Sequence, residues 1–320
     1  MMVAVVISMI LIGGVIQIFI GSKQTYRFQQ SLARVQESGR YAIEAMTRDL
    51  RMVGYRGCLG PSVSLTNTLN NPTDYEWSFD EGLVGHEATG GNWDPALDPD
   101  ILNPEPGNDV LTIRAPDRLD IIVTNHPGGS PPGSANLQVP ANSGLEEDDI
   151  VMVSDCQAAA VFQITNNNPD SGTLVHNTGG GSTPGNATKD LGKEFAGGNV
   201  TRISARTYYV RQGASGLPSL WRRVNDNAAE ELVENVEQMQ IRYGVDTNGD
   251  RQLDEYRSAD AVANWDNVLS VRVSLLLAGI EDNITDDPQQ VTFNGATFTA
   301  GDRRLRQVMT TTVALRNRLP

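Results

Sequence analysis

The sequence is poor in the residues and motifs on which enzyme active sites usually depend. Among its 320 residues are only three histidines, His86, His126 and His176, in separate loop-like contexts without the spacing of metal ligands. It contains no G-x-S-x-G sequence, no Walker motif and no dinucleotide-binding fingerprint. We therefore predict that the protein is not an enzyme.

Basic residues are also scarce. The chain has 25 Lys and Arg against 39 Asp and Glu, a formal net charge of −14 and a pI of about 4.6. A surface of this sign repels phosphate backbones, so we expect no nucleic-acid partner. The acidic groups at residues 146–149 and at Asp94, Asp98 and Asp100 are typical of solvated loops rather than of paired catalytic carboxylates. The charge suits an exported surface or one that collects divalent cations.

Cysteine occurs only twice, as Cys58 and Cys156. In a cytosolic protein these would be two unrelated buried thiols, whereas outside the cytoplasm a lone pair usually forms one disulfide. That disulfide would close a loop of roughly a hundred residues. The chain-entropy model predicts that a bond of this kind stabilises the fold by roughly 4–5 kcal/mol. The choice between the two interpretations depends on the side of the membrane on which the cysteines lie.

The first twenty residues, by contrast, carry no charge and a single amide, Gln17. A helix of this length spans about 30 Å, the thickness of a bilayer core. A cleavable signal peptide is disfavoured because no basic segment precedes the apolar run and no small-x-small site follows it. A buried core helix is an alternative, but a position at the start of the chain favours a membrane anchor.

The basic residues nearest to this anchor, Lys23, Arg27 and Arg34, all follow it. Taken literally, the positive-inside rule would place the rest of the chain in the cytoplasm. The acidic composition and the two cysteines indicate the opposite side. We therefore expect that a short basic leader once preceded Met1.

Beyond the anchor, apolar or small residues recur every three or four positions, which predicts an amphipathic continuation of the helix. These positions are Phe28, Leu32, Val35, Gly39, Ala42, Met46, Leu50 and Val53. Gly54 and Gly57 are expected to end the helix, and Gly39 predicts a close approach by a sheet. We divide the chain into residues 1–22, the membrane or filament-core half; residues 23–56, the amphipathic half; and residues 57–320, an extracytoplasmic head.

The head is low in aromatic residues (6% of the chain) and the chain has 31 glycines, which favours a loop-rich β structure. Strands are predicted at 109–115, 119–124, 149–155, 160–165, 200–212, 219–224, 239–245, 267–278 and 306–317. A short helix is predicted at 230–236, with long surface loops at 92–108, 127–134 and 166–184. We expect an α+β fold with one long helix packed on antiparallel β-sheets.

One loop has the spacing of a calcium-binding sequence. Oxygen-bearing side chains stand at its positions 1, 3, 5 and 9, and a backbone carbonyl at position 7 would add a ligand. The residues are Asp246, Asn248, Asp250, Gln252 and Asp254. Positions 6 and 12 are arginine, where an EF-hand has Gly and Glu. A hairpin turn would favour the same residues, but we predict calcium as the cofactor.

Residues 21–58 read GSKQTYRFQQSLARVQESGRYAIEAMTRDLRMVGYRGC. This block resembles the helix of the PilW-type minor pilins of type IV pili. Residues 153–165 resemble the second cysteine segment of that family, and residues 231–250, 265–277 and 303–320 resemble its later blocks. The resemblance implies a pilin-like fold with a single-pass anchor in the inner membrane and a head in the periplasm. It also implies transfer to the extracellular pilus, at the tip.

The resemblance further implies a set of partners: other minor pilins, the major pilin, a large tip adhesin and the assembly platform in the inner membrane. The subunit would join the complex that primes assembly and caps the tip. The family's leader, and the F-T-L-x-E sequence at its cleavage point, are not in the chain, and Met1 and Met2 would fall just after that Glu. No processing residue is therefore assigned.

Two alternative functions remain open. One is a J-type pseudopilin of type II secretion, a smaller relative with the same architecture. The other is a membrane-anchored, calcium-dependent binding protein that never polymerises.

Overall fold

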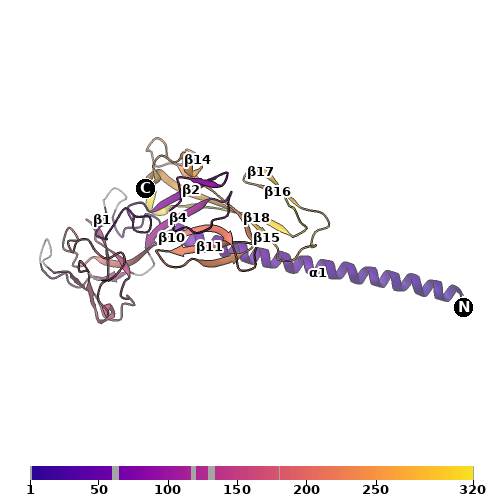
Figure 1. The fold of residues 1–320 in the computed structure, drawn as a ribbon, viewed down its shortest axis with the longest axis horizontal. Helices are drawn as coiled ribbons and strands as arrows, with labels where there is room; N and C mark the ends of the chain where they lie inside the picture. The colour runs from indigo at the N-terminus through magenta and orange to yellow at the C-terminus, as the bar shows by residue number, and fades with distance from the viewer. Residues whose placement is uncertain (1, 60–64, 117–119, 129–133, 180, 320) are drawn as a thin grey trace.

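The chain begins with a long α-helix, α1 (Met2–Leu50), whose first part extends away from the head (Figure 1). The computed structural model describes residues 2–59, 65–116, 120–128, 134–179 and 181–319, with side chains from residue 5 onward. No proline interrupts α1, so its hydrogen bonds run unbroken from the apolar half into the amphipathic half. At about 1.5 Å per residue the helix is roughly 74 Å long.

The helix ends at Leu50, slightly before the predicted end near Gly54. Turns follow, and Gly54 has a φ of 75°, a conformation that glycine adopts without strain. The side-chain amide of Asn317 donates to the carbonyl oxygens of Arg51 and Val53, at 3.1 Å each. The C-terminal end of the chain therefore satisfies carbonyls that the end of the helix leaves open.

The larger sheet is organised around the long strand β10 (Asn199–Gln212). The first residues of β10 pair with β7 (Ile150–Ser154) and β5 (Ile121–Ile122), and later residues pair with β4 (Val110–Pro116) and β11 (Pro218–Val224). The other strands of this sheet are β1 (Leu65–Asn67), β2 (Leu83–Thr89), β3 (Asn92–Asp94), β8 (Ala159–Gln163) and β12 (Glu230–Glu234). β1 and β8 are parallel, and the other strand pairs of this sheet that the structure describes are antiparallel.

A second, antiparallel sheet has the order β14-β13-β15-β18. Its strands are β13 (Val236–Val245), β14 (Glu255–Arg257), β15 (Val268–Ala278) and β18 (Arg306–Ala314). Two further strand pairs form separate small sheets: β16 (Gln290–Phe293) with β17 (Ala296–Thr299), and β6 (Asn136–Gln138) with β9 (Thr173–Val175). The 3-10 turns are η1 (Pro169–Ser171), η2 (Ala259–Ala261), η3 (Trp265–Asn267) and η4 (Arg316–Arg318).

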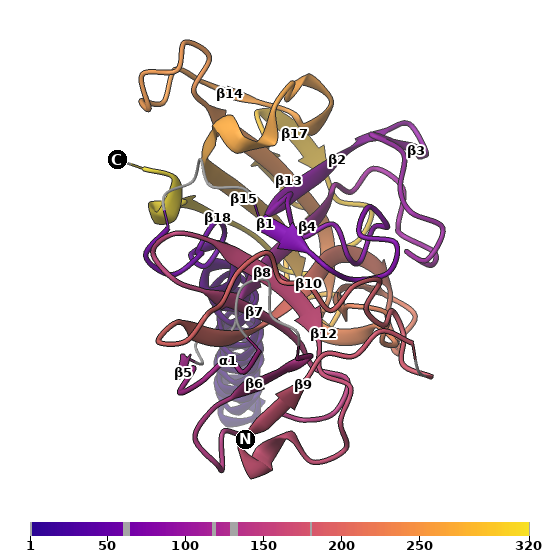
Figure 2. The ribbon, with the colours of Figure 1, turned by 90° about the vertical axis from the view of Figure 1, so that its left-hand side faces the viewer.

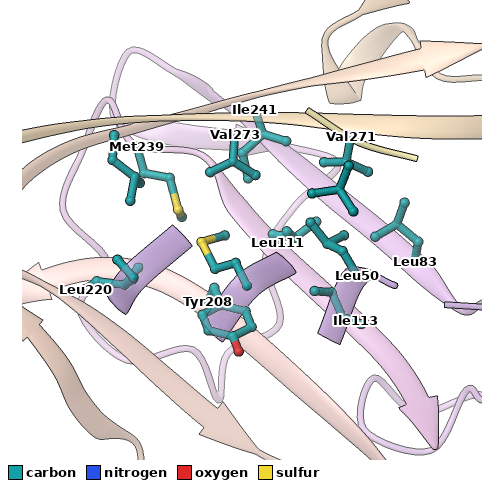
Figure 3. Packing of buried hydrophobic residues seen from close by; sticks show 14 of the residues in the cluster. Leu50, Leu83, Leu111, Ile113, Tyr208, Leu220, Met239, Ile241, Val271 and Val273 are labelled. Atoms are coloured by element: carbon teal, nitrogen blue, oxygen red, sulfur yellow. The ribbon is translucent and has the colours of Figure 1, made fainter. Parts of the chain in front are cut away.

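The amphipathic half of α1 and the inner faces of both sheets share one hydrophobic core (Figure 3). Leu50 of α1, Leu111 of β4, Tyr208 of β10, Ile241 of β13 and Val273 of β15 are all fully buried in it. Burial of these apolar faces is the main favourable contribution to the fold. The expected α+β architecture, one long helix on mostly antiparallel sheets, is confirmed.

A separate apolar cluster lies at the end of the molecule opposite the N-terminus, where β6, β7, β8 and β9 gather (Figure 1, Figure 2). Leu137, Val153, Phe162, Leu174 and Phe195 are among its buried members. We call the described residues between 120 and 198 the distal lobe. β10 connects this lobe to the core around the helix, so the two share one continuous sheet.

Some predicted elements differ from the structure. Residues 230–236 were expected to be helical, but Glu230–Glu234 is strand β12, paired with β11. Cross-strand pairing there overrides the local helical preference of the Glu-rich segment. The strand predicted at 119–124 is reduced to β5, with Leu119 outside the described residues, and the strand predicted at 306–317 ends at Ala314. The expected loops at 92–108 and 166–184 contain β3, η1 and β9, while most of 127–134 lies outside the described residues.

Candidate functional site

The first half of α1 exposes apolar side chains on all sides. Met9, Ile18 and Phe19 are 74%, 72% and 69% exposed, and the described side chains of the apolar half from Val5 to Ile20 are all exposed. This helix is long and apolar enough to cross a membrane. An apolar surface of this extent requires lipid or other apolar helices around it.

The second half of α1 docks on the head through the predicted face. Its members Val35, Gly39, Ala42, Met46, Leu50 and Val53 are buried, and Leu32 is half-buried. Phe28 does not belong to this face, because it is 38% exposed. It lies one turn before Ser31, the first residue of the helix that the head buries. The docked segment is therefore about one turn shorter than the pattern predicted.

Gly39 allows the helix to approach the second sheet closely. A Cβ atom at this position would overlap the sulfur of Met309 on β18 and would lie 3.1 Å from Cδ1 of Leu277 on β15. A side chain at position 39 would therefore force the Met309 side chain out of its place and press on that of Leu277. The predicted close approach is present at this glycine.

A buried polar contact near the end of α1 was not predicted. The hydroxyl of Tyr208 on β10 donates to Oδ2 of Asp49 at 2.6 Å, and Nε of Arg206 lies 3.7 Å from the same oxygen. All three residues are at least nine-tenths buried. Burial, followed by the charge of Asp49, raises the pKa of the Tyr208 hydroxyl. An acidic residue three positions after Met46, beside the apolar face, is a sequence signal that could have indicated this contact.

Cys58 and Cys156 form a disulfide, with a Cα–Cα distance of 5.0 Å. Cys58 follows the turn after α1, and Cys156 follows β7 in the distal lobe. The bond therefore links the end of the helix directly to the lobe farthest from the N-terminus. It closes a loop of 98 residues, which includes β2 and β4 of the core.

The predicted calcium loop connects β13 to β14 (Figure 2). The Asp246 carboxylate is 4% exposed and accepts hydrogen bonds from the backbone N–H groups of Asn248, Gly249 and Arg251. Burial opposes its charge, but these hydrogen bonds together hold the pKa of Asp246 below its usual value. Asp246 thus remains an anion at neutral pH, at the centre of a loop folded around it.

Asp254 closes the same loop. Its carboxylate accepts hydrogen bonds from the hydroxyl and the backbone N–H of Thr247, at 2.7 Å each, and these bonds lower its pKa. In the described part of the chain, however, the carboxylates of Asp246, Asp250 and Asp254 do not converge within 4.8 Å of one another. The loop has the donor set of a calcium site and would have to draw its carboxylates together around a cation.

The acidic group that does converge within 4.8 Å is Glu76, Asp98 and Asp100. Arg223 on β11 neutralises it, with salt bridges of 2.7 Å to Glu76 and 3.2 Å to Asp100. The guanidinium of Arg223 therefore already lies where a metal ion would bind to this acidic group. Asp100 was expected to be a solvated loop residue, and its side chain is 61% exposed, but its salt bridge to Arg223 also ties the loop to the large sheet.

Two of the histidines are not in separate contexts as the sequence suggested. The rings of His126 and His176 lie edge to face with centroids 6.3 Å apart in the distal lobe, and both side chains are almost fully buried. Burial, together with the charge of His126, lowers the pKa of His176 to about 4. Nδ1 of His126 accepts the backbone N–H of Phe195, so the proton of the neutral His126 ring is on Nε2. Both rings are therefore neutral at pH 7. His86 lies apart from them, on β2, with Nδ1 hydrogen-bonded to the carbonyl of Pro95.

A buried carboxylate joins the two sheets. Asp109, just before β4, accepts the N–H groups of Ala88 on β2 and Ile241 on β13, at 3.0 and 2.7 Å. It is 1% exposed, and burial together with the charge of Glu87 raises its pKa to about 7. Asn108 adds a bond of 2.6 Å from the N–H of Met239. These two side chains substitute for strand pairing where the sheets meet.

Comparison with known families matches the second sheet and the strands that precede it. Residues 207–317 match the family model described as "Type IV Pilus-assembly protein W". No curated protein and no solved structure matches the chain. The matched segment runs from within β10 to η4 and includes every strand of the second sheet. That family consists of pilus-assembly proteins and not of enzymes. The chain therefore carries, at residues 207–317, a domain of the PilW family of type IV pilus assembly.

Proposed function

We propose that the chain is a minor pilin that joins the complex priming and capping the type IV pilus. The observation that carries this proposal is the division of α1 into an exposed apolar half and a half buried in the head. One continuous helix with these two halves suits both the membrane-bound subunit and the subunit in the filament. Lipid covers its apolar half while the subunit waits in the inner membrane, and the helices of other pilins cover it in the filament.

The size of the head favours a position at the tip. The long loops and the distal lobe add bulk far from the helix, and bulk at the tip does not disturb the packing of subunits below. In this position the subunit contacts other minor pilins and the first major pilins, and it helps to display a large tip adhesin. Its head faces the periplasm before assembly and the cell exterior afterwards, where the Cys58–Cys156 disulfide persists.

Complementation of a deletion strain tests this proposal. The full chain should restore surface pili, and a variant with residues 1–22 replaced by an unrelated transmembrane helix should not, because the replacement anchors the head but cannot pack in the filament. Restoration by both would indicate an anchored protein that never polymerises. Loss of type II secretion with normal piliation would instead indicate a J-type pseudopilin.

We further propose that the loop containing Asp246, Asn248, Asp250, Gln252 and Asp254 binds calcium. The support is its donor set and the folding of its backbone around an ionised Asp246. Calcium would draw Asp250 and Asp254 inward and stiffen the β13–β14 hairpin, within the segment that matches the family.

Calorimetry and thermal melting in a calcium series test the loop. Calcium should raise the melting temperature, and Asp250→Ala should abolish the rise. Asp286→Ala, which removes an exposed carboxylate elsewhere, should retain it. An unchanged melting temperature at millimolar calcium would show that the loop is a structural turn and not a calcium site. That result would not bear on the proposed pilin function.

A further inference from the structure

A groove interrupts the large sheet halfway along β10. β7 pairs with β10 as far as Arg202, and β11 pairs with it from Arg206 onward. Both strands lie on the edge of β10 opposite β4, because β4 pairs with residues 203–208. The gap between β7 and β11 opens into a groove with a cavity volume of about 660 Å³, which is within the usual range of ligand-binding clefts.

The floor of this groove is one face of β10. Side chains alternate along a strand, so Arg202, Ser204 and Arg206 project from the same face, and all three line the groove. Ser204 is 5% exposed, and its hydroxyl has no hydrogen-bond partner among the described residues. A buried hydroxyl without a partner costs free energy, so a ligand that enters the groove gains by bonding to it.

Both arginines of the floor already have carboxylate partners. Nε of Arg202 lies 3.5 Å from Oδ2 of Asp149, and its Nη2 donates to the carbonyl of Gly144 at 3.2 Å. Nε of Arg206 lies 3.7 Å from Oδ2 of Asp49, a residue outside the groove. These ion pairs balance the two positive charges of the floor.

The two ends of the groove are acidic turns. The turn before β7 carries Glu146, Glu147 and Asp148, and the turn after β11 carries Asp226. All four side chains are exposed, and within the described residues none of them forms a salt bridge. The lining therefore carries four negative charges that no described basic side chain balances, which favours a cationic ligand.

The positions of these carboxylates indicate which kind of cation fits. In the described part of the chain, the acidic group that converges within 4.8 Å includes none of them, so a single metal ion finds no ready set of ligands here. Carboxylates at two ends of a groove instead suit a ligand with several separated positive charges. Ser182, Ser204 and Asn227 line the groove as well and can bond to the amides of a peptide backbone.

We propose that this groove binds a basic segment of a partner chain. Lys or Arg side chains of the segment pair with the carboxylates of residues 146–148 at one end and with Asp226 at the other, and its backbone lies over Ser204. The site does not depend on the proposed function, since its binding is measured on the isolated protein.

Calorimetry on the full chain in a neutral detergent tests the groove with three probes: acetyl-Lys-Gly-Lys-Gly-Lys-amide, the same peptide with Gln in place of each Lys, and spermidine. At about 50 mM salt we expect the lysine peptide to bind with a Kd on the order of 100 µM and the glutamine peptide at least about tenfold more weakly. Spermidine carries the same number of charges without amide groups, so it should bind more weakly than the lysine peptide.

Three results would overturn the proposal. Equal binding of the two peptides would exclude pairing with the carboxylates, and spermidine that binds at least as tightly as the lysine peptide would indicate attraction between charges alone. Absence of binding of the lysine peptide would exclude the site.

Paired variants distinguish the groove from the general acidity of the surface. Glu147→Gln combined with Asp226→Asn removes one charge from each end and should weaken binding of the lysine peptide by about tenfold. The control pair, Glu37→Gln with Asp286→Asn, removes the same two charges from exposed positions elsewhere and should leave the affinity unchanged. If the two pairs have equal effects, the groove is not the binding site.

Ser204→Ala tests the floor of the groove. Because the Ser204 hydroxyl has no partner in the described structure, its removal should not lower the melting temperature. The affinity for the lysine peptide should nevertheless fall by about threefold, and with an undiminished melting temperature this loss cannot result from misfolding. An unchanged affinity would show that the peptide does not reach the floor and would overturn its placement in the groove.

Discussion

His126 and His176 share the interior of the distal lobe, where protonation of either ring places a charge among apolar neighbours. His176 packs against Phe162 with ring centroids 4.9 Å apart, and its ring nitrogens have no partner among the described residues. The charged groups that act on the pair are Glu194, which favours protonation of His126, and Lys189, which disfavours protonation of His176. Neither compensates for burial, so the lobe is sensitive to acid.

Acid should destabilise the fold through His176. Its pKa is about 4 in the folded chain and 6.5 in the unfolded chain, so its contribution to stability is complete above pH 6.5 and is lost as the pH falls towards 4. The loss is on the order of 3 kcal/mol. The measurement is the free energy of unfolding of the native protein minus that of His176→Leu, from pH 4 to 8. A difference that does not vary with pH would show that His176 is not buried in this way.

A rise in pH should destabilise the fold through Asp109. Because its pKa is about 7 when folded and 3.8 when unfolded, its contribution is complete below pH 3.8 and is lost as the pH rises through 7. The free energy of unfolding relative to Asp109→Asn should therefore fall by about 4 kcal/mol between pH 4 and pH 8. The free energy of unfolding has to be compared with that of each variant separately. His176 and Asp109 titrate over overlapping pH ranges, and a rise in pH changes their contributions to stability in opposite directions. Identical pH profiles for the native protein and Asp109→Asn would contradict the assignment.

At the scale of elements, the docking of α1 on the second sheet depends on the absence of a side chain at position 39. Gly39→Val should destabilise the head by about 2 kcal/mol, because the new methyl groups overlap Met309 and Leu277. Met309→Ala should recover part of this loss by opening space, so the double variant should be more stable than additivity predicts. Chemical denaturation measures both effects. Strictly additive changes would mean that residues 39 and 309 are not in contact.

The disulfide connects two elements that the core does not otherwise join directly, the end of α1 and the distal lobe. Replacing Cys58 and Cys156 with serine should lower the free energy of unfolding by about 4 kcal/mol, since the bond closes 98 residues. Intact mass of the unfolded chain should rise by about 2 Da on reduction. An unchanged mass would show that the two thiols are free.

At the scale of the whole molecule, the sequence predicted the elements that have strong periodicity. The helix and its buried face followed from apolar residues three and four apart, and β4, β10, β11, β13, β15 and β18 from β-branched runs. The predictions failed where distant partners decide the structure. Residues 230–234 are a strand because β11 lies beside them, and Phe28 is exposed because the head begins one turn later.

The polar sites were less predictable than the fold. The spacing of Asp246 to Asp254 is local, so a cation site could be predicted there from the sequence alone, and it stays a prediction. The contacts of Asp49 with Tyr208, and of His126 with His176, join residues 159 and 50 positions apart, and no local pattern encodes such distances.

The proposed function requires this chain to be itself a subunit of the pilus. Quantitative mass spectrometry of filaments sheared from cells and purified, combined with immunogold labelling of the head, tests this requirement. Peptides of this chain should be present at a small fraction of the major pilin, with gold at one end of each filament. Purified filaments that lack the chain while it remains in the inner membrane would rule out a pilus subunit, and labelling along the whole filament would rule out the tip position.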